Sequence, residues 1–460
     1  MTSPSEQFAR ELVAIDAASL TEEDLAQVER LLYDYSVVAY GGSALPWVQK
    51  LHRWAERRTA VGGAQIVGSA ARAPADLAAH LNGSAAHSYE LDDTHAMSLS
   101  HPGSVVNSAA LAVAQERDAA LAPGELAAAI IAGYEAIGRL GRAAVAAPLM
   151  GHGFHPTALL GPFGASVAAG KLLGHGVEEL LVGWGHALSA CSGSTQFSQD
   201  ARGTDIKRLH AGLAARNGVQ AAQMADVGLG APYDAITGRY GFLALYAATE
   251  PELDALQGSA AGSRVIHELI FKPYASCGLL HATVDALAIA LADLEVSPES
   301  VESIRIGVQQ KAIDQHMERR PVSAMSAQYS LPFVVGATLT AGPWDYSVYD
   351  RLEGPQYDEI LAYGDRVEVY LNEEFERDFP TRGGSEIEVR LVDGTTRSAT
   401  VRDSLGSPNV PMSVEQLRRK GDGLLRDVDP DFDLDQLSTA VRAAAVDSDT
   451  DHLATVLARA

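Results

Sequence analysis

A cluster of histidines and carboxylates lies between His87 and His101, where the sequence reads HSYELDDTH and, after five intervening residues, HPGS. Packing rarely requires so many titratable groups at such close spacing. His and Asp are good metal ligands, but the regular spacing of a motif such as HExxH is missing. A metal site is therefore one interpretation, and a solvated surface loop is another. The third is acid–base catalysis, because imidazole and carboxylate groups can transfer protons near neutral pH.

Two histidines stand directly before a proline at the predicted start of a helix. Pro102 and Pro156 suit the first helical turn, where the N–H that proline lacks would be unpaired anyway. His101 and His155 would then lie beside backbone N–H groups with partial positive charge, which favours a bound anion. Glycines surround the second pair in GHGFHPT and indicate close backbone approach to a ligand or only a tight turn. Their spacing is not that of a dinucleotide-binding loop.

A third group of charged residues, Lys207, Arg208 and His210, opens another predicted helix. Lys207 and His210 are three residues apart and therefore share a helix face. Cations at the amino end of a helix are unfavourable with its dipole unless a negative group lies between them. We therefore expect a carboxylate beside them, either from a ligand or from a protein residue such as Asp205.

The composition excludes several classes of protein. The 460 residues carry a formal net charge of -24, which argues against nucleic acid because phosphate binding needs a basic surface. Any anionic ligand must be held by a local cluster of cations. Cys191 and Cys277 are too few for a disulfide framework or for the roughly four thiolates of a cysteine-held zinc or iron–sulfur site. We expect a cytoplasmic protein without a signal peptide or membrane span.

Helical periodicity dominates the first 265 or so residues. Thr21-Glu22-Glu23-Asp24 is typical of a capping box, and the apolar positions that follow share one helical face. Similar helical segments are predicted at 47–58, 76–91, 124–146 and 206–227. The abundant alanines fit close helix packing.

The pattern changes to alternating strands and helices after about residue 265. Strands are predicted around Ile304, Val367 and Ile387, and Asp393-Gly394 is typical of a hairpin turn. Helical segments lie at 281–294 and near 331–340, and helices return after residue 413. Lys272 stands at the switch and either lines a cleft between domains or is merely solvated.

Taken in order, these motifs resemble those of the MmgE/PrpD family, which includes 2-methylcitrate dehydratase, cis-aconitate decarboxylase and iminodisuccinate epimerase. The resemblance is carried along nearly the whole chain by HSYELDDTH–HPG, GHGFHPT–LGPFG, KRLHAGLAARNG, GRYGFL, FKPYASCGLLH and AQYSLPF. It implies a mainly α large domain, a helical bundle, over 1–267. A smaller α+β lid domain over 268–406 would be inserted before the C-terminal helices of 407–460, which return to the bundle. It further implies a homodimer that uses no metal or cofactor and binds small polycarboxylates between its domains.

The resemblance implies functional roles for Thr94, His101, His155, Lys207 and Lys272, and further charged residues of the same motifs complete the candidate site. The predicted catalytic residues are His101, His155 and Lys207. The predicted substrate-binding residues are Glu90, Asp93, Thr94, Lys272, Arg208 and His210. Three positions depart from the decarboxylase pattern, which has Asp at Glu90, His at Cys277 and Tyr at Phe333. We interpret the departures as evidence against decarboxylation of cis-aconitate.

These observations predict a cofactor-independent lyase or isomerase acting on a small polycarboxylate. The favoured reaction is dehydration of a 2-methylcitrate-like hydroxy acid, with one histidine removing the proton beside a carboxylate and the other protonating the departing hydroxyl. Lysines would hold the carboxylates and stabilise the enolate-like intermediate. The alternatives are an epimerase or racemase of an iminodisuccinate-like dicarboxylate, a cis-aconitate-type decarboxylase, a metal-dependent hydrolase built on His87, Asp92, Asp93 and His95, and a binding protein without activity.

Overall fold

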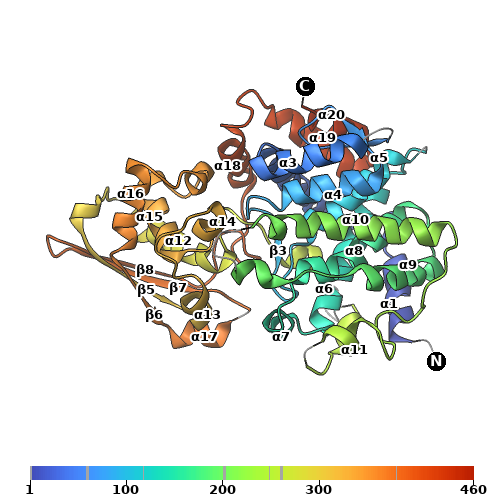
Figure 1. Cartoon of the computed structure of the whole chain (residues 1–460), viewed down its shortest axis with the longest axis horizontal. Helices are drawn as coiled ribbons and strands as arrows, with labels where there is room; N and C mark the ends of the chain where they lie inside the picture. The colour runs from blue at the N-terminus through green and yellow to red at the C-terminus, as the bar shows by residue number, and fades with distance from the viewer. Residues whose placement is uncertain are drawn as a thin grey trace. The chain divides into compact units, whose positions relative to one another are not determined.

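The protein folds into two units. The computed structural model describes residues 3–58, 62–117, 119–199, 204–247, 249–258, 263–379 and 381–459 (Figure 1). The first unit contains the described residues of Met1–Gln199, Asp205–Leu269 and Leu425–Ala460. The second contains those of Asp200–Thr204 and Ile270–Leu424. The described residues from 425 onward therefore belong to the same unit as the N-terminal helices, whereas residues 407–424, which were expected there too, belong to the second unit.

The first unit is mainly helical. Its helices and short strands are α1 (Pro4–Val13), α2 (Glu22–Ser43), α3 (Pro46–Ala55), β1 (Ala64–Gln65), β2 (Arg72–Ala73), α4 (Ala75–Ala86), β3 (Thr94–His95), α5 (Pro102–Glu116), α6 (Glu125–Ala143), α7 (Ala146–Gly151), α8 (Pro156–Leu172), α9 (Val177–Ala190), α10 (Ile206–Asp226), α11 (Phe242–Tyr246), α19 (Leu434–Asp447) and α20 (Thr450–Val456). Helix α10 packs against α8, α4 and α9, and α19 packs against α2.

Local signals in the sequence set several of these helix ends. Thr21 and Asp24 form the predicted capping box at the start of α2. Pro102 and Pro156 are the first residues of α5 and α8, as predicted. The helix predicted over 76–91 ends earlier, at Ala86, because the chain turns there and Glu90 adopts a positive φ of 58°.

Glycines allow α4 to approach two other helices very closely. A Cβ atom added to Gly83 would lie 2.9 Å from Cα of Gly212 in α10 and 2.9 Å from the Ser104 carbonyl oxygen in α5. A Cβ at Gly212 would clash with the His80 carbonyl oxygen and lie 2.8 Å from the Ser84 backbone nitrogen. Because neither position has room for a side chain, the helix backbones meet, and residues at the ends of α4, α5 and α10 are brought together.

The second unit combines helices with a four-stranded sheet. Its helices and strands are α12 (His281–Ala290), β5 (Val301–Val308), α13 (Gln310–Gln315), α14 (Ala324–Gln328), α15 (Leu331–Ala341), α16 (Pro355–Gly364), β6 (Val367–Leu371), α17 (Glu373–Asp378), β7 (Ser385–Leu391), β8 (Thr396–Val401) and α18 (Val414–Leu425), whose last residue begins the returning segment of the first unit. Strand β4 (Leu269–Ile270) spans the boundary between the units. The strand order is β6-β5-β7-β8, with β6 parallel to β5 and the other pairs antiparallel.

The predicted hairpin is present between β7 and β8. Gly394 has a φ of 88°, a conformation that favours glycine, and the Asp393 carboxylate accepts a bond from the Thr395 backbone N–H at 2.8 Å. Ile387 and Val389 alternate with exposed residues along β7 and are fully buried, and α12 packs against β7 and β8. The expected fold class, mainly α with a smaller α+β region, is confirmed.

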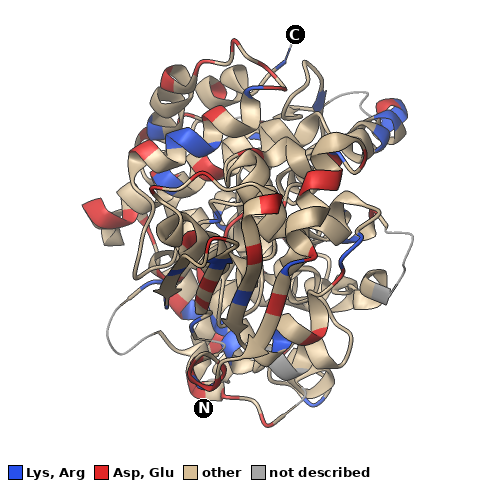
Figure 2. Ribbon diagram, turned by 90° about the vertical axis from the view of Figure 1, so that its left-hand side faces the viewer, with Lys and Arg blue, Asp and Glu red and all other residues tan. Residues whose placement is uncertain are grey.

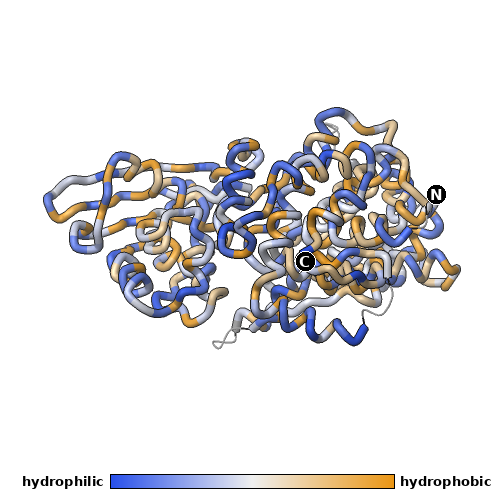
Figure 3. The backbone as a smooth tube through the Cα atoms, turned by 90° about the horizontal axis from the view of Figure 1, so that it is seen from above, coloured by the Kyte–Doolittle hydropathy of each residue, from blue (hydrophilic) through white to orange (hydrophobic). Residues whose placement is uncertain are grey.

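Acidic residues and alternating hydropathy are found in both the helices and the strands. Figure 2 shows Asp and Glu (red) on helices and strands alike, in keeping with 59 acidic against 35 basic residues. Figure 3 shows hydrophobic and hydrophilic stretches alternating along the backbone, as amphipathic elements require. None of the helices in the described chain is long and apolar enough to cross a membrane.

Candidate functional site

Four histidines from separate segments of the first unit form a continuous row. The ring of His87, which follows α4, lies 5.0 Å from that of His101 and 5.9 Å from that of His155, measured between centroids. His155 in turn lies 5.0 Å from His210. His101 and His155 are the N-cap residues of α5 and α8, and His210 lies in the first turns of α10. The structure thus brings together three predicted site residues and adds His87 to them.

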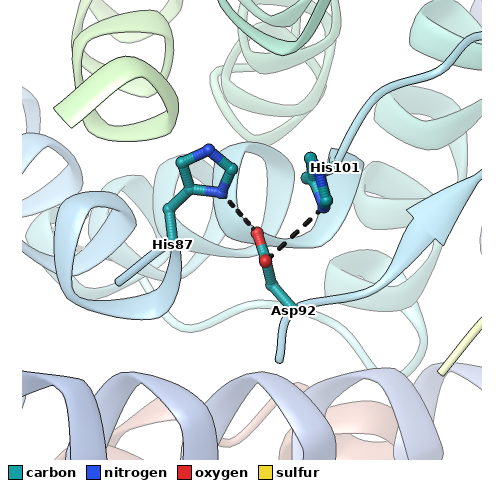
Figure 4. A group of neighbouring side chains, drawn as sticks. All are labelled: His87, Asp92 and His101. Carbon is teal, nitrogen blue, oxygen red and sulfur yellow. Dashed lines mark hydrogen bonds and ion pairs between the residues drawn. The ribbon is translucent and has the colours of Figure 1, made fainter. Parts of the chain in front are cut away.

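A carboxylate links the first two histidines of the row. Oδ2 of Asp92 lies 2.6 Å from Nδ1 of His87, and Oδ1 lies 3.5 Å from Nδ1 of His101 (Figure 4). Oδ2 also accepts a bond from the Ser104 hydroxyl. Burial is the main cause that lowers the pKa of His87 to about 3. Asp92 opposes this shift, whereas the charge of Lys207 adds to it. His87 is therefore a neutral imidazole at neutral pH.

The ring of His101 is oriented by its neighbours. Its Nδ1 lies 3.0 Å from the Asp93 carbonyl oxygen and 3.3 Å from the Thr94 hydroxyl. Because a carbonyl oxygen only accepts hydrogen bonds, Nδ1 carries the proton and Nε2 has the basic lone pair. The backbone N–H of His101 donates to the Thr157 hydroxyl at 3.0 Å, which ties the start of α5 to α8. His101 can therefore act as a proton acceptor through Nε2.

His155 and His210 share a hydrogen bond between their Nδ1 atoms, which lie 2.9 Å apart. One ring must donate and the other accept, so the two are in different tautomers. Burial and the neighbouring histidines lower the pKa of His155 well below its usual value. Burial and Lys207 lower the pKa of His210 to about 4. The pair is uncharged at neutral pH and can pass one proton along the bond.

The carboxylate expected beside Lys207 is Glu90. The Lys207 ammonium donates to Oε1 of Glu90, and the two side chains are 2% and 1% exposed. Glu90 has a positive φ, a conformation that is strained for a non-glycine residue and typical of functional sites. Asp205, the sequence-based candidate, instead lies 3.8 Å from Lys50. The charge of Lys207 lowers the pKa of both His87 and His210, so Lys207 acts on the histidine row while it is paired with a buried acid.

Two predicted substrate-binding residues make structural contacts within the first unit. Asp93 accepts bonds from the Gly103 N–H and the Tyr134 hydroxyl, both at 2.8 Å. Burial raises the pKa of Asp93 to about 7, although these two bonds act in the opposite direction. Arg208 donates to the Ser88 carbonyl oxygen, and its guanidinium lies 4.5 Å from the centroid of the Trp47 ring.

The remaining predicted residues lie in two different places. Thr94 is partly exposed in β3 and contacts His101 as described. Lys272 belongs to the second unit, where it is 2% exposed. Its role in substrate binding stays a prediction.

One group of described residues has the geometry to hold a metal ion. One ligand atom from each of His87, Asp92 and His101 lies within 4.8 Å of the others. The hydrolase interpretation also expected Asp93 and His95 among the ligands. The Asp93 carboxylate instead accepts a hydrogen bond at the start of α5, and His95 contacts Ser98 at 2.8 Å. The hydrogen bond between His87 and Asp92 accounts for the approach of those two side chains without an ion.

Comparison with known proteins identifies the family of the chain. The MmgE/PrpD N-terminal domain matches residues 6–254, and the MmgE/PrpD C-terminal domain matches residues 274–441. The chain belongs to the MmgE/PrpD family. It is 26% identical over 433 residues to a cis-aconitate decarboxylase of Aspergillus terreus, covering 88% of this chain and 86% of the relative. It is 27% identical over 434 residues to the cis-aconitate decarboxylase of Homo sapiens, covering 91% and 87%. This protein is thus an enzyme of the MmgE/PrpD type.

Sequence reasoning found the motif that contains His87 and Asp92 but gave neither residue a place in the favoured site. Both lie in HSYELDDTH, whose density of titratable groups was the available signal. Their importance depends on the turn after α4, which directs His87 toward His155 and Asp92 toward His101.

Proposed function

We propose that this enzyme is a cofactor-independent lyase acting on a small polycarboxylate, with dehydration of a 2-methylcitrate-like hydroxy acid as the favoured reaction. The observation that carries the proposal is that His101 and His155, at the starts of two helices, both lie beside His87, whose pKa the charge of Lys207 also lowers. Helix starts and an ammonium group attract carboxylates, and imidazoles transfer protons. The relatives, named for action on cis-aconitate, support a polycarboxylate as the substrate.

His101 is the base in this proposal. Its Nε2 would remove the proton from the carbon beside a substrate carboxylate, while Asp92 stabilises the imidazolium that forms. Lys207 would stabilise the enolate-like charge that develops on the carboxylate. Glu90 would have to share Lys207 with the substrate, so substrate binding would weaken a buried ion pair.

His155 and His210 supply the proton for the departing hydroxyl. Both imidazoles are neutral in the unliganded enzyme because burial disfavours their charged forms. A bound polyanion would raise their pKa values, because a nearby negative charge favours the protonated form. The pair would thus take up a proton when substrate binds and deliver it to the leaving oxygen.

Decarboxylation of a tricarboxylate is the second candidate, because the curated relatives are cis-aconitate decarboxylases. Three differences argue against it: Glu90, Cys277 and Phe333 replace the Asp, His and Tyr of the decarboxylase pattern. Epimerisation of a dicarboxylate shares the proton-removal step and differs only in the return of the proton. The family resemblance further predicts that Thr94 and Lys272 bind substrate and that the enzyme is a homodimer.

A panel of small acids separates these reactions. The purified enzyme is incubated in deuterium oxide with citrate, methylcitrate, aconitate, tartrate-like and aminodicarboxylate compounds and followed by proton NMR. A dehydratase gives an unsaturated product that absorbs in the ultraviolet, an epimerase returns substrate labelled with deuterium, and a decarboxylase releases carbon dioxide. Lack of turnover across the panel, with thermal stabilisation by one of the acids, would favour a binding protein.

The histidine assignment is tested on the substrate so found. His101→Asn should lower kcat by about 100- to 10,000-fold, because the base is removed. His152→Asn is the matched control, since His152 lies three residues before His155 but is exposed, and its replacement should leave kcat unchanged. Equal activity of the two variants would contradict the assignment. Metal analysis of the active enzyme tests the metal-dependent alternative, because stoichiometric zinc or manganese would point to metal chemistry, for which His87, Asp92 and His101 have the geometry.

A further inference from the structure

The second unit contains a cysteine and a histidine whose side chains face each other. Sγ of Cys277 lies 3.7 Å from Nε2 of His316. The other ring nitrogen, Nδ1, lies 3.0 Å from the Tyr329 carbonyl oxygen. Because a carbonyl oxygen only accepts, Nδ1 carries the ring proton and Nε2 presents its lone pair to the thiol. Nucleophile, base and orienting group are arranged as in enzymes that activate a cysteine.

The backbone holds both partners in place. Cys277 precedes the short 3₁₀ turn Gly278–Leu280 that leads into α12, and its N–H donates to the Gln328 carbonyl oxygen at 2.9 Å. His316 directly follows α13, and its carbonyl oxygen accepts a bond from the Leu331 N–H at 2.7 Å. The approach of sulfur to imidazole is therefore fixed by three chain segments and does not depend on one flexible side chain.

The charges around the pair favour a thiolate. Burial alone would raise the pKa of the Cys277 thiol, but His316, Lys272 and the Leu279 N–H lower it to about 7. The thiolate in turn raises the pKa of His316, against the effects of burial and of Lys311. Cys277 is partly exposed, whereas His316 and Lys272 are 4% and 2% exposed. The partly exposed Cys277 therefore lies in a positively charged environment.

We propose that Cys277 and His316 form a nucleophile–base pair that reacts covalently with small anionic electrophiles, such as carboxylates that carry an activated double bond. His316 takes the thiol proton on Nε2, and the sulfur forms a bond to the electrophilic carbon. With an alkene, the π electron pair moves to the neighbouring carbon, which receives the proton back from His316. With a haloacid, the carbon–halogen bond breaks and the halide leaves with its electron pair. The inference rests on the contact between Cys277 and His316 and not on the proposed lyase reaction, although Lys272 is a predicted substrate-binding residue of that reaction.

The other cysteine provides an internal reference. Cys191 is buried, and its Sγ lies 3.1 Å from the Leu188 carbonyl oxygen, to which it donates. Burial raises the pKa of Cys191, so its thiolate is scarce at neutral pH. Both residues can be followed in one sample by mass spectrometry of their peptides.

The test uses the native full-length chain and two alkylating probes, iodoacetamide and iodoacetate. Alkylation of Cys277 between about pH 5 and 9 should rise with a midpoint near 7, while Cys191 reacts slowly throughout. A midpoint at about 8.5, the value of an ordinary thiol, would overturn the proposal. This measurement needs no variant.

Two comparisons then separate the roles of base and charge. His316→Gln should slow alkylation of Cys277 about fivefold at about pH 6. His152→Gln is the matched control. An unchanged rate in His316→Gln would show that His316 does not act as the base for Cys277. At low salt, the ratio of the alkylation rate with iodoacetate to that with iodoacetamide at Cys277 should be higher in the folded protein than in the urea-unfolded chain. Equal preference in both states would show that anionic reagents are not selected.

Discussion

At the scale of single residues, the pairing of Glu90 with Lys207 sets a limit on what the site can bind. Both side chains are buried, and the Glu90 backbone is held at a positive φ. A buried ion pair is favourable only while both partners remain, because either charge alone is poorly solvated. In the proposed mechanism, the substrate therefore brings a carboxylate that replaces or shares the contact with Glu90, which favours polyanions over neutral molecules.

This pairing predicts a large loss of stability on neutralising one partner. Glu90→Gln should lower the free energy of unfolding by about 3 kcal/mol, because Lys207 keeps its charge without its acid, and urea denaturation measures the change. The double variant Glu90→Gln/Lys207→Met should recover part of the loss. Glu302→Gln is the control, since its ion pair with Arg390 is about half exposed and should contribute less than ~1 kcal/mol. Equal effects of the two single variants would contradict the prediction.

Asp93 predicts a pH dependence of stability with a definite sign. Its pKa is about 7 in the folded enzyme and about 3.8 in the unfolded chain, so the folded state binds the extra proton between these values. Its contribution is therefore most favourable below about pH 4 and is lost as the pH rises to about 7, by up to about 4 kcal/mol. Asp93→Asn should remove this trend, so the difference in unfolding free energy between variant and wild type should change between pH 4 and 7. A constant difference would mean that Asp93 is ionised in the fold.

At the scale of helices and strands, the site depends on how closely three helices approach. Gly83 and Gly212 let α4 meet α5 and α10 with their backbones in contact, and the ends of these helices carry His87, His101 and Lys207. A shift of α10 by the width of a methyl group would move Lys207 relative to the histidines. Catalytic geometry tolerates such displacement poorly.

Gly212→Ala tests this dependence. The added Cβ would meet the His80 carbonyl oxygen and the Ser84 backbone, which cannot move without displacing α4. We expect a loss of about 3 kcal/mol in stability, as in overpacked cores, together with a lower kcat. Gly230→Ala is the control, because a Cβ there meets nothing within 4 Å. Unchanged kcat and unfolding midpoint in Gly212→Ala would show that the helices can separate without disturbing the site.

Elements of this kind also show what the sequence could and could not predict. The starts of α5 and α8 follow from His–Pro pairs, and the β7–β8 turn follows from Asp393-Gly394, because proline and glycine act through local backbone geometry. The partner of Lys207 could not be predicted, because Glu90 lies 117 positions away and the contact exists only after α4 and α10 have packed. The row from His101 to His210 is a tertiary feature for the same reason.

At the scale of the whole molecule, the negative charge opposes the binding of the proposed substrate. The chain carries a formal net charge of -24, and within the first unit Lys207 is already paired with Glu90 while Asp92 lies beside His101. A polyanion approaching this site is therefore repelled at long range and attracted only at short range. Salt screens charges that are separated by more than about 10 Å at 0.1 M ionic strength but affects buried contacts much less.

The activity should therefore increase with moderate salt. Raising the ionic strength from about 0.01 to about 0.15 M should increase kcat/KM for a polycarboxylate on the order of twofold, because screening removes the repulsion during approach. The rate at saturating substrate should change little, since the substrate is then already bound. Initial rates in sodium chloride and in potassium chloride distinguish this screening from the effect of a particular ion. A steady fall in kcat/KM from the lowest salt onward would show that cations dominate the field along the substrate's path, despite the acidic composition of the chain.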